Sequence, residues 1–493
     1  MNDNNFIYSN SYTSLPNDFY EDRKPVPVLK PKLLKLNTDL CKYLNLNEKF
    51  LEQEGASFLS GNKIARSSKP ISLAYAGHQF GNFVDSLGDG RAVLLGEIKA
   101  EDGKLFDIQL KGSGKTRFSR QGDGRSPLGP VIREYILSEA IHFLGIPTTR
   151  SLSIVTTGEF VERESKLPGG ILARIASSHI RIGTFEFFHF RNQKKNLKQL
   201  ADYTISRHFP EIKKKKGNLY KLLLEKTISL QANLVSKWLN VGFIHGVMNT
   251  DNTTISGETI DYGPCAFMNQ YNPDTVYSYI DIKGRYCYGN QAQIIFWNLT
   301  RFAESLSSII HDDPKESQKL IISSLEKFPK MFNDSWNSLV KEKFGFSKEI
   351  SGDDKIIISF LEILLKNKVD FTKAFRNLSI SLENKTGKES FFSRFINKKE
   401  IKVWHNKWQN RIKEENEKEE EIVKKLKMTN PSVIPRNHIV EDIIDQVVID
   451  ENIKPLDELI SMLKKPFNDY EENHKFLMPP KENEDIKNTF CGT

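Results

Sequence analysis

Two polar residues near the middle of the chain carry the oxygen ligands that a hard divalent cation prefers. Asn252 ends the segment His245-Gly-Val-Met-Asn-Thr-Asp-Asn252, and Asp261 begins Asp261-Tyr-Gly-Pro264. The residues between them, 253–260, predict a short hairpin around Ser256-Gly-Glu258, which would bring Asn252 and Asp261 side by side. An amide oxygen beside a carboxylate is a ligand pair that Mg²⁺ accepts when bound phosphates supply the rest. A lone Asp or Asn is more often a turn residue, so the metal hypothesis depends on this pairing.

A lysine upstream is expected on a rigid strand. Residues 92–98 and 105–111 flank Glu-Asp-Gly-Lys at 101–104, and Asp-Gly between apolar runs predicts a β-hairpin. Strand alternation places Phe106, Ile108 and Leu110 on one face and Lys111 on the other, with its amine directed outward. Without further context, such a lysine is simply solvated.

Glycines and arginines surround this hairpin. Gly88-Asp-Gly-Arg91 precedes the first strand, and residues 112–129 contain five glycines together with Lys115, Arg117, Arg120 and Arg125. Glycine lets backbone N–H groups approach an anion, and arginine matches phosphate oxygens bidentately. Neither the Walker A nor the Rossmann pattern is present, so composition alone indicates phosphate binding, and a flexible basic loop is the competing interpretation.

The next elements add a carboxylate and two more cations. Helical spacing over 131–144, with Pro130 in the first turn and Gly145 at the end, predicts a helix that carries Glu134 and Glu139. Either glutamate could pair with Lys111. Residues 170–176 then predict a strand with Arg174 on the polar face, and Arg181 follows.

The order of these features is typical of protein kinases: a glycine loop, a strand lysine, a helix glutamate, a helical lobe, a His…Asn loop, a hairpin and Asp-x-Gly. A long helix over about 219–239 leads into the His245 segment. A kinase carries its catalytic aspartate two residues after this histidine, where the chain has Val247. Asp251 is the only nearby carboxylate that could replace it.

Six segments together resemble the selenoprotein O (YdiU) family, over a span from about residue 20 to Cys491. They are Gly88-Asp-Gly-Arg-Ala92, Gln109-Leu-Lys-Gly-Ser-Gly114, Gly122-Asp-Gly-Arg125, Gly145-Ile-Pro-Thr-Thr-Arg150, His245–Asn252 and Asp261–Pro264. Members of this family resemble protein kinases in fold and are described as transferring AMP from ATP to hydroxyl side chains of proteins.

The resemblance implies a role for each matching residue. ATP contacts are implied for Gly88, Gly90, Arg91, Lys111, Asp123, Gly124, Arg174, Arg181 and Asp261, of which Asp123 rests on the resemblance alone. Asp251 is implied as proton acceptor, and Asn252 with Asp261 as ligands of Mg²⁺ or Mn²⁺. Glu134 is implied as the catalytic partner of Lys111, with Glu139 as the alternative. The nucleotide is expected to lie reversed relative to kinases.

Cys491 occupies the position where many animal members of the family carry selenocysteine. A redox role is one interpretation, with Cys265 or Cys287 as partner, and an inert tail thiol is the other.

Composition excludes several classes of protein. The 493 residues include 71 Lys and Arg against 63 Asp and Glu, a net charge of +8 that does not by itself indicate nucleic-acid binding. The four cysteines form no Cys-x-x-Cys pair, and neither a signal peptide nor a membrane-length apolar run is found. We therefore expect a cytoplasmic monomer with no membrane or nucleic-acid partner.

The distribution of strand-like and helical patterns along the chain predicts an α+β, protein-kinase-like, two-lobed fold with terminal extensions. We expect an N-terminal extension over 1–60, a β-rich nucleotide-binding lobe over 61–180, a helical catalytic lobe over 181–400 and a helical extension over 401–493. The favoured function is Mg²⁺-dependent AMP transfer from ATP to Ser, Thr or Tyr hydroxyls of proteins. A protein kinase and a catalytically inactive nucleotide-binding scaffold are the alternatives.

Overall fold

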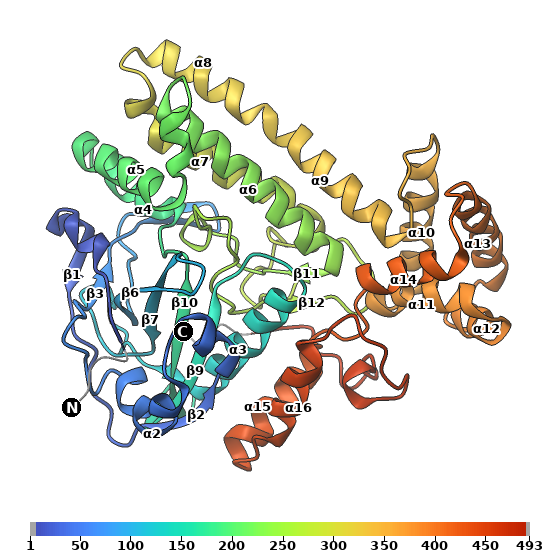
Figure 1. Ribbon diagram of the computed structural model, residues 1–493, viewed down its shortest axis with the longest axis horizontal. Helices are drawn as coiled ribbons and strands as arrows, with labels where there is room; N and C mark the ends of the chain where they lie inside the picture. The colour runs from blue at the N-terminus through green and yellow to red at the C-terminus, as the bar shows by residue number, and fades with distance from the viewer. Residues whose placement is uncertain (1–5, 490–493) are drawn as a thin grey trace.

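The computed structural model describes residues 6–489 and shows an α+β protein (Figure 1), as the sequence predicts. The strands are β1 (Tyr20–Asp22), β2 (Lys32–Leu36), β3 (Ile71–Leu73), β4 (Gly77–Gln79), β5 (Asn82–Val84), β6 (Ala92–Lys99), β7 (Leu105–Lys111), β8 (Ser126–Pro127), β9 (Arg150–Glu162), β10 (Lys166–Ala176), β11 (Phe243–Ile244) and β12 (Ala266–Phe267). All but the last two come from the first 176 residues, and helices follow.

The helices divide into groups that Figure 1 separates by colour. Those that precede or interrupt the sheet are α1 (Thr38–Tyr43), α2 (Glu48–Leu59) and α3 (Leu128–Phe143). Those in the upper part of the view are α4 (Ile182–His189), α5 (Lys194–His208), α6 (Leu219–Val241), α7 (Gln291–Ile310), α8 (Pro314–Leu325) and α9 (Lys327–Lys343). The remainder are α10 (Asp353–Asn367), α11 (Phe371–Glu383), α12 (Lys385–Ser393), α13 (Lys398–Lys413), α14 (Glu419–Thr429), α15 (Asn437–Ile449) and α16 (Lys454–Leu463).

The main sheet is antiparallel in all its described pairings. Its strands run in the order β1-β3-β6-β7-β10-β9-β2, with β8 paired to β10, so segments from the first sixty residues form both edges. The β6–β7 hairpin confirms the Asp-Gly prediction. Across β7 and β10, Arg174 lies opposite Gln109 and Leu172 opposite Lys111, which places Arg174 and Lys111 on one face of the sheet.

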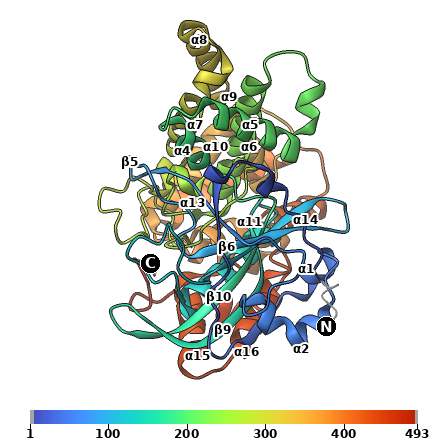
Figure 2. The same cartoon turned by 90° about the vertical axis from the view of Figure 1, so that its left-hand side faces the viewer.

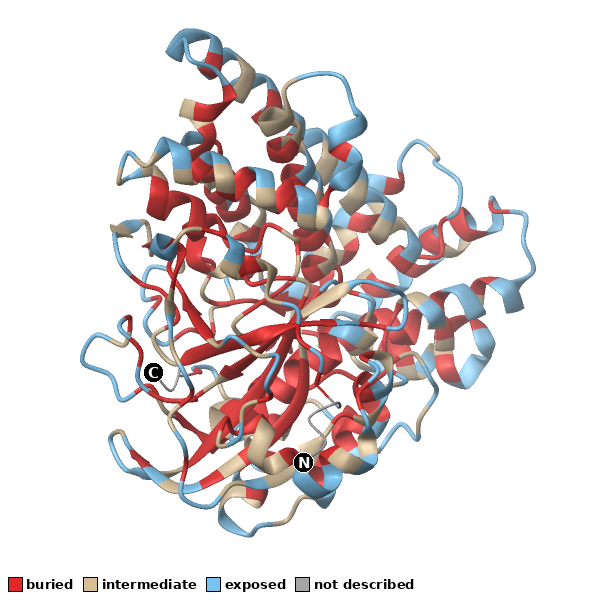
Figure 3. Cartoon of the chain, turned by 60° about the vertical axis from the view of Figure 1, so that its left-hand side comes forward, coloured by how far each residue is buried: buried red, intermediate tan, exposed pale blue. Residues whose placement is uncertain are grey.

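The two faces of β7 and β10 are both covered. Ile108, Leu110 and Ile171 are fully buried on the apolar face, against a core that includes α1 and α2. On the polar face Gln109 is also fully buried, and Figure 3 shows the strands largely in the interior. The expected outward direction of Lys111 is therefore correct relative to the sheet, but its amine points into the interior of the protein and not into solvent.

Helix α3 is held between the sheet and the C-terminal helices. Figure 1 shows α15 and α16 beside it, and Figure 2 shows the same two helices near β9 of the sheet. Ile132 and Ile136 of α3 share a core with Ile443 of α15. Arg133, also buried, donates to the carbonyl of Cys265 (2.7 Å) and to Asn437 Oδ1 (2.6 Å). The C-terminal helices thus brace the helix that carries Glu134.

The prediction of a hairpin over 253–260 is wrong, because these residues form no strand pair with one another. Thr254 pairs with Arg181 and Thr259 with Thr148 in isolated bridges, so the two arms bond to neighbouring segments. The Thr254 hydroxyl accepts from Glu258 N (2.9 Å) and donates to Glu258 O (2.7 Å), which replaces the backbone bonds of a ladder. The Thr254 side chain therefore closes a loop, and not a hairpin, between Asn252 and Asp261.

Within residues 6–489, no helix has both the length and the apolar character needed to cross a membrane.

The packing of α15 on α3 generates a stability prediction. Ile443 is fully buried, whereas Ile449 on the same helix is 73% exposed. Ile443→Ala should lower the free energy of unfolding by about 2–5 kcal/mol, because it leaves a cavity against α3. The matched control Ile449→Ala should change it by less than about 0.5 kcal/mol. Urea unfolding measures both, and equal losses would contradict this packing.

Candidate active site

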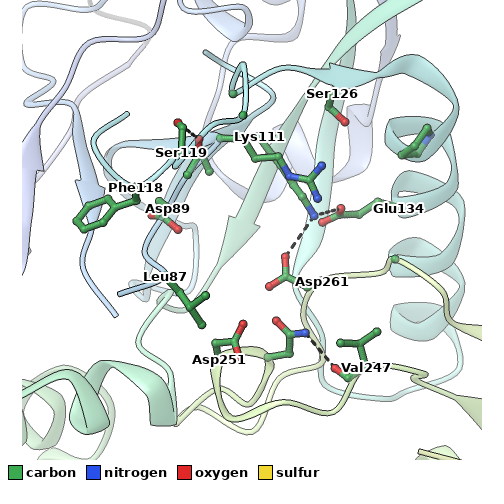
Figure 4. Close-up of a pocket in the computed structure, with 18 of the residues that line it drawn as sticks. Leu87, Asp89, Lys111, Phe118, Ser119, Ser126, Glu134, Val247, Asp251 and Asp261 are labelled. Carbon is green, nitrogen blue, oxygen red and sulfur yellow. Dashed lines mark hydrogen bonds and ion pairs between the residues drawn. The ribbon is translucent and has the colours of Figure 1, made fainter. Parts of the chain in front are cut away.

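All the residues that the sequence assigns to the site line a single cavity of about 540 Å³. They are Gly88, Gly90, Arg91, Lys111, Asp123, Gly124, Glu134, Arg174, Arg181, Asp251, Asn252 and Asp261. A volume of this size is typical of sites for small-molecule ligands. The cavity lies where the polar face of the sheet meets α3 and the 247–264 segment, and Figure 4 shows the side chains converging there.

Asp261 is the centre of charge in this cavity. Its carboxylate accepts from Lys111 Nζ (3.2 Å), from Arg174 Nη1 (2.6 Å) and from Arg181 Nη1. Burial alone would raise the pKa of Asp261, but the charges of Arg181, Arg174 and Lys111 outweigh burial and hold the pKa well below its ordinary value. Asp261 is therefore ionised, and its backbone takes a left-handed conformation (φ 62°).

Glu134, and not Glu139, contacts the strand lysine. Lys111 Nζ lies 2.5 Å from Glu134 Oε2, and Figure 4 shows both side chains directed at one another above Asp261. Glu139 instead accepts a hydrogen bond from Arg150 Nη2 (2.6 Å). This geometry decides between the two glutamates that the sequence left open.

A buried hydrogen-bond chain orients Arg174. Its Nη2 donates to Gln109 Oε1 (2.5 Å), and Gln109 Nε2 donates to Asp89 Oδ2 (2.9 Å). Asp89 also accepts from the backbone N–H of Leu73 (3.1 Å). The guanidinium is thereby fixed in a plane from which it reaches Asp261, and neither Asp89 nor Gln109 was predicted to act in this way.

Asp251 lies lower in the same cavity and has an unused oxygen. Its side chain is buried, and within the described residues Oδ1 has no hydrogen-bond partner, while Oδ2 receives Gln79 Nε2 at 3.4 Å. Burial raises the pKa of Asp251 to about 7, against the opposing charge of Arg181. A carboxylate with this pKa and a free oxygen is suited to accept a proton near neutral pH.

The turn that carries Asp251 is anchored by residues that the sequence did not reveal. Thr250 Oγ1 donates to the fully buried Glu186 of α4 and accepts from His78 N (2.7 Å), and Glu186 Oε1 lies 2.5 Å from His78 Nδ1. Beside this network, a Cβ atom added to Gly77 would lie 2.5 Å from Asp251 Oδ1. No local pattern connects residues 77–79 to Asp251, because they meet only in the folded chain.

The β4–β5 hairpin holds Gln79 over Asp251 through a tight turn. Phe80 and Gly81 both have positive φ (51° and 86°), as a two-residue hairpin turn requires. Phe80 N donates to Asn249 Oδ1 (3.0 Å) and to Tyr286 Oη (3.1 Å), which compensates for the strain of positive φ at a bulky residue.

His245 has a structural role. Its Nε2 lies 2.8 Å from the carbonyl of Ile260, its Nδ1 accepts from Val247 N at 3.4 Å, and burial lowers its pKa. A neutral imidazole between two backbone groups joins the 245–252 and 260–264 segments. Val247, two residues after His245 in the sequence, lines the cavity.

Asn252 and Asp261 suit a divalent cation in their chemistry. Asn252 Nδ2 donates to the carbonyl of Val247 (3.0 Å), which leaves the amide oxygen as the donor atom for a metal. With the ionised Asp261 this gives two hard oxygen ligands, and Asp251 Oδ1 is a third unsatisfied oxygen nearby. In residues 6–489, no group of three or more His, Cys, Asp or Glu side chains forms a complete metal site, so phosphate oxygens would have to complete the shell.

Close packing of neighbouring atoms explains two glycines near the predicted phosphate loop. A Cβ at Gly88 would lie 2.3 Å from Phe118, and one at Gly124 would lie 2.2 Å from the backbone of Gly114. Asp123, beside them, is paired with Arg163 Nη1 at 2.9 Å. Arg163 also lines the cavity and was not identified from the sequence.

The cysteines of the described chain form no disulfide. Cys41, Cys265 and Cys287 are buried. Cys491 lies outside the described residues, so its redox role stays a prediction.

Comparison with known proteins agrees with the resemblance seen in the sequence. The family model described as "Protein adenylyltransferase SelO" matches residues 3–464. The chain is similar to a protein named "Protein nucleotidyltransferase YdiU" from Halalkalibacterium halodurans, with 47% identity over 487 residues that cover 99% of this chain and 97% of that protein. The protein of the same name from Bacillus cereus strain G9842 is 46% identical over 494 residues, covering 100% and 99% of the two chains.

A third relative with that name, from Bacillus anthracis, is 47% identical over 485 residues, covering 98% of this chain and 97% of that protein. Matches of this extent confirm the family resemblance, and the chain belongs to the SelO family of protein adenylyltransferases, which are nucleotidyltransferase enzymes.

Proposed function

We propose that this protein transfers AMP from ATP to Ser, Thr or Tyr hydroxyls of other proteins, with Mg²⁺ or Mn²⁺, on a two-lobed, protein-kinase-like fold. The observation that carries the proposal is the cavity in which Lys111, Glu134, Asp251 and Asp261 meet, while Val247 occupies the position of the kinase base. The membership of the chain in an adenylyltransferase family supports the choice of AMP over phosphate as the transferred group.

The cations of the cavity would bind the triphosphate. Lys111, Arg174 and Arg181 all point at Asp261, and both arginines are only 2% exposed, so they are already desolvated and positioned. Preorganised charges of this kind stabilise a leaving group that develops negative charge, as pyrophosphate does. When bound, a divalent cation held by Asn252 and Asp261 would supply further charge neutralisation.

Asp251 would act as the proton acceptor. The acceptor hydroxyl loses its proton to Asp251, its oxygen forms a bond to the α-phosphorus, and the bond from that phosphorus to the pyrophosphate oxygen breaks. Burial, which raises the pKa of Asp251 to about 7, gives it the basicity that general-base catalysis needs near neutral pH.

Labelling decides between AMP transfer and the kinase alternative. With ATP labelled separately at the α- and γ-phosphates, we expect only the α-label to appear on acceptor protein, because pyrophosphate is the leaving group. Asp251→Asn should reduce labelling by at least about a hundredfold, since it removes the proton acceptor. Protein labelled only from the γ-position would overturn the proposal, and no transfer by any preparation that binds ATP would favour the inactive scaffold.

The metal hypothesis predicts a shift in cation dependence. Asn252→Ala should raise the Mg²⁺ concentration needed for half-maximal activity by about tenfold or more, because one oxygen ligand is lost. The control Asn473→Ala changes an exposed asparagine that does not line the cavity and should leave this concentration unchanged. Activity that survives complete chelation of divalent cations would contradict the metal site.

The close packing of Gly77 on Asp251 predicts a positioning effect. Gly77→Ala should lower kcat by about tenfold to a hundredfold with little change in nucleotide affinity, because the added methyl group displaces the Asp251 carboxylate. In the control Gly55→Ala, the new Cβ finds its nearest neighbour at an ordinary 3.4 Å, and activity should be retained. Equal kcat values for both variants would show that Asp251 is not held by this contact.

A further inference from the structure

An exposed apolar loop contributes to the rim of the cavity that Asp251 also lines. The loop of residues 276–285 exposes Tyr279, Ile280 and Ile282 by 58%, 61% and 93%, and Ile280 also lines the cavity. Several exposed apolar side chains on one loop, one of them lining the cavity, are costly in water and indicate a surface that contacts a partner.

This loop is held in place by buried hydrogen bonds. Asp281 is buried and accepts from the backbone N–H groups of Arg285 (2.9 Å) and Tyr286 (2.7 Å). Thr489, near the end of the described chain, donates from N to Tyr277 O (2.7 Å) and from Oγ1 to Pro264 O (2.6 Å). The apolar side chains are therefore presented by a loop with defined geometry, which lowers the entropic cost of binding.

Two cations beside these apolar side chains lack an acidic partner. Within residues 6–489, neither Lys283 nor Arg285 forms an ion pair, and the carboxylate of Asp281, two residues before Lys283, accepts from backbone N–H groups. The guanidinium carbon of Arg285 lies 4.8 Å from the centre of the Trp297 ring and packs against Gly81. Arg285 is thus held at the β4–β5 turn with its charge uncompensated.

The rim is continuous with the turn that carries Asp251. Tyr286 Oη, next to Arg285, donates to Asn249 Oδ1 (2.6 Å), and Gln79 of the β4–β5 hairpin contacts Asp251. A segment that places a hydroxyl at Asp251 would therefore extend over the 276–285 loop.

We propose that Tyr279, Ile280, Ile282, Lys283 and Arg285 form an acceptor-docking surface. It binds an extended protein segment in which the acceptor hydroxyl is flanked by an apolar and an acidic residue. The apolar residue packs on Ile280 and Ile282, and the acidic residue pairs with Arg285 and Lys283 by charge complementarity. This inference rests on the proposed function and adds the class of protein segment that the enzyme modifies.

Synthetic peptides test this surface with the intact enzyme. Each peptide carries one acceptor hydroxyl and one leucine, with Glu, Gln or Lys at each flanking position in turn, and transfer from α-labelled ATP is measured. We expect kcat/KM to be about fivefold to tenfold higher for the best Glu peptide than for its Lys counterpart, as a partly exposed charge pair allows. Arg285→Glu combined with Lys283→Glu should reverse this order.

The apolar part of the surface has its own matched control. Ile282→Ser should raise KM for the preferred peptide several-fold, with kcat and KM for ATP unchanged, because Ile282 is exposed and does not line the cavity. Ile449→Ser, at a 73% exposed isoleucine far along the chain on α15, should leave all these constants unchanged. Preserved KM for ATP in every variant also shows that each has folded.

Three results would overturn the docking surface. They are equal kcat/KM for the Glu and Lys peptides, transfer to none of the peptides, and a homodimer in solution that Ile282→Ser dissociates, which would assign the rim to a second copy of the chain. Failure of the proposed function is distinct, because it would appear as absence of α-label on whole proteins as well as on peptides.

Discussion

The carboxylate of Asp261 is the group on which the arrangement of this site depends. It accepts hydrogen bonds from Lys111 of β7, from Arg174 of β10 and from Arg181 after β10. The sheet and the helical part of the chain therefore meet at this one carboxylate. Buried cations are tolerated only when they are paired and hydrogen-bonded. The same pairing that stabilises this interior fixes three positive groups in one cavity, as the proposed binding of phosphates requires.

Further contacts hold the charged groups around Asp261 in position. Glu134 balances Lys111 from α3, and α3 is braced on its far side by α15 and by the contacts of Arg133. Arg174 is held through Gln109 by Asp89. The C-terminal helices, distant in sequence from the residues that line the cavity, therefore contribute to its geometry through α3.

The Asp251 carboxylate has different neighbours from the Asp261 carboxylate. Its turn is anchored to α4 through Thr250 and Glu186 and is covered by the β4–β5 hairpin. Asp261 is held strongly ionised by its cations, whereas Asp251 is buried with little compensation, so two aspartates in one cavity have opposite pKa shifts. Such a division suits one carboxylate for binding and the other for proton transfer.

The sequence by itself determined the elements whose signals are local. Asp-Gly between apolar runs identified the β6–β7 hairpin, and helical spacing with Gly145 identified α3. Strand alternation placed Lys111 and Arg174 each on the polar face of its own strand, and the pairing of β7 with β10 then put them on one face of the sheet. The family segments contain most of the predicted residues that line the cavity, whereas Glu134, Arg174 and Arg181 lie outside them, on or just after elements that helix and strand patterns predicted.

Tertiary structure decided what depends on the relative placement of elements. Glu134 and Glu139 are separated by about 140° around their helix, and only the packing of α3 on the sheet turned Glu134 toward Lys111. The 253–260 hairpin was mispredicted because the Thr254 side chain and neighbouring segments take the hydrogen bonds that a ladder would have used. Gly77, Glu186 and Arg285 gave no local signal, since their roles come from contacts between distant segments, which no periodicity of the chain records.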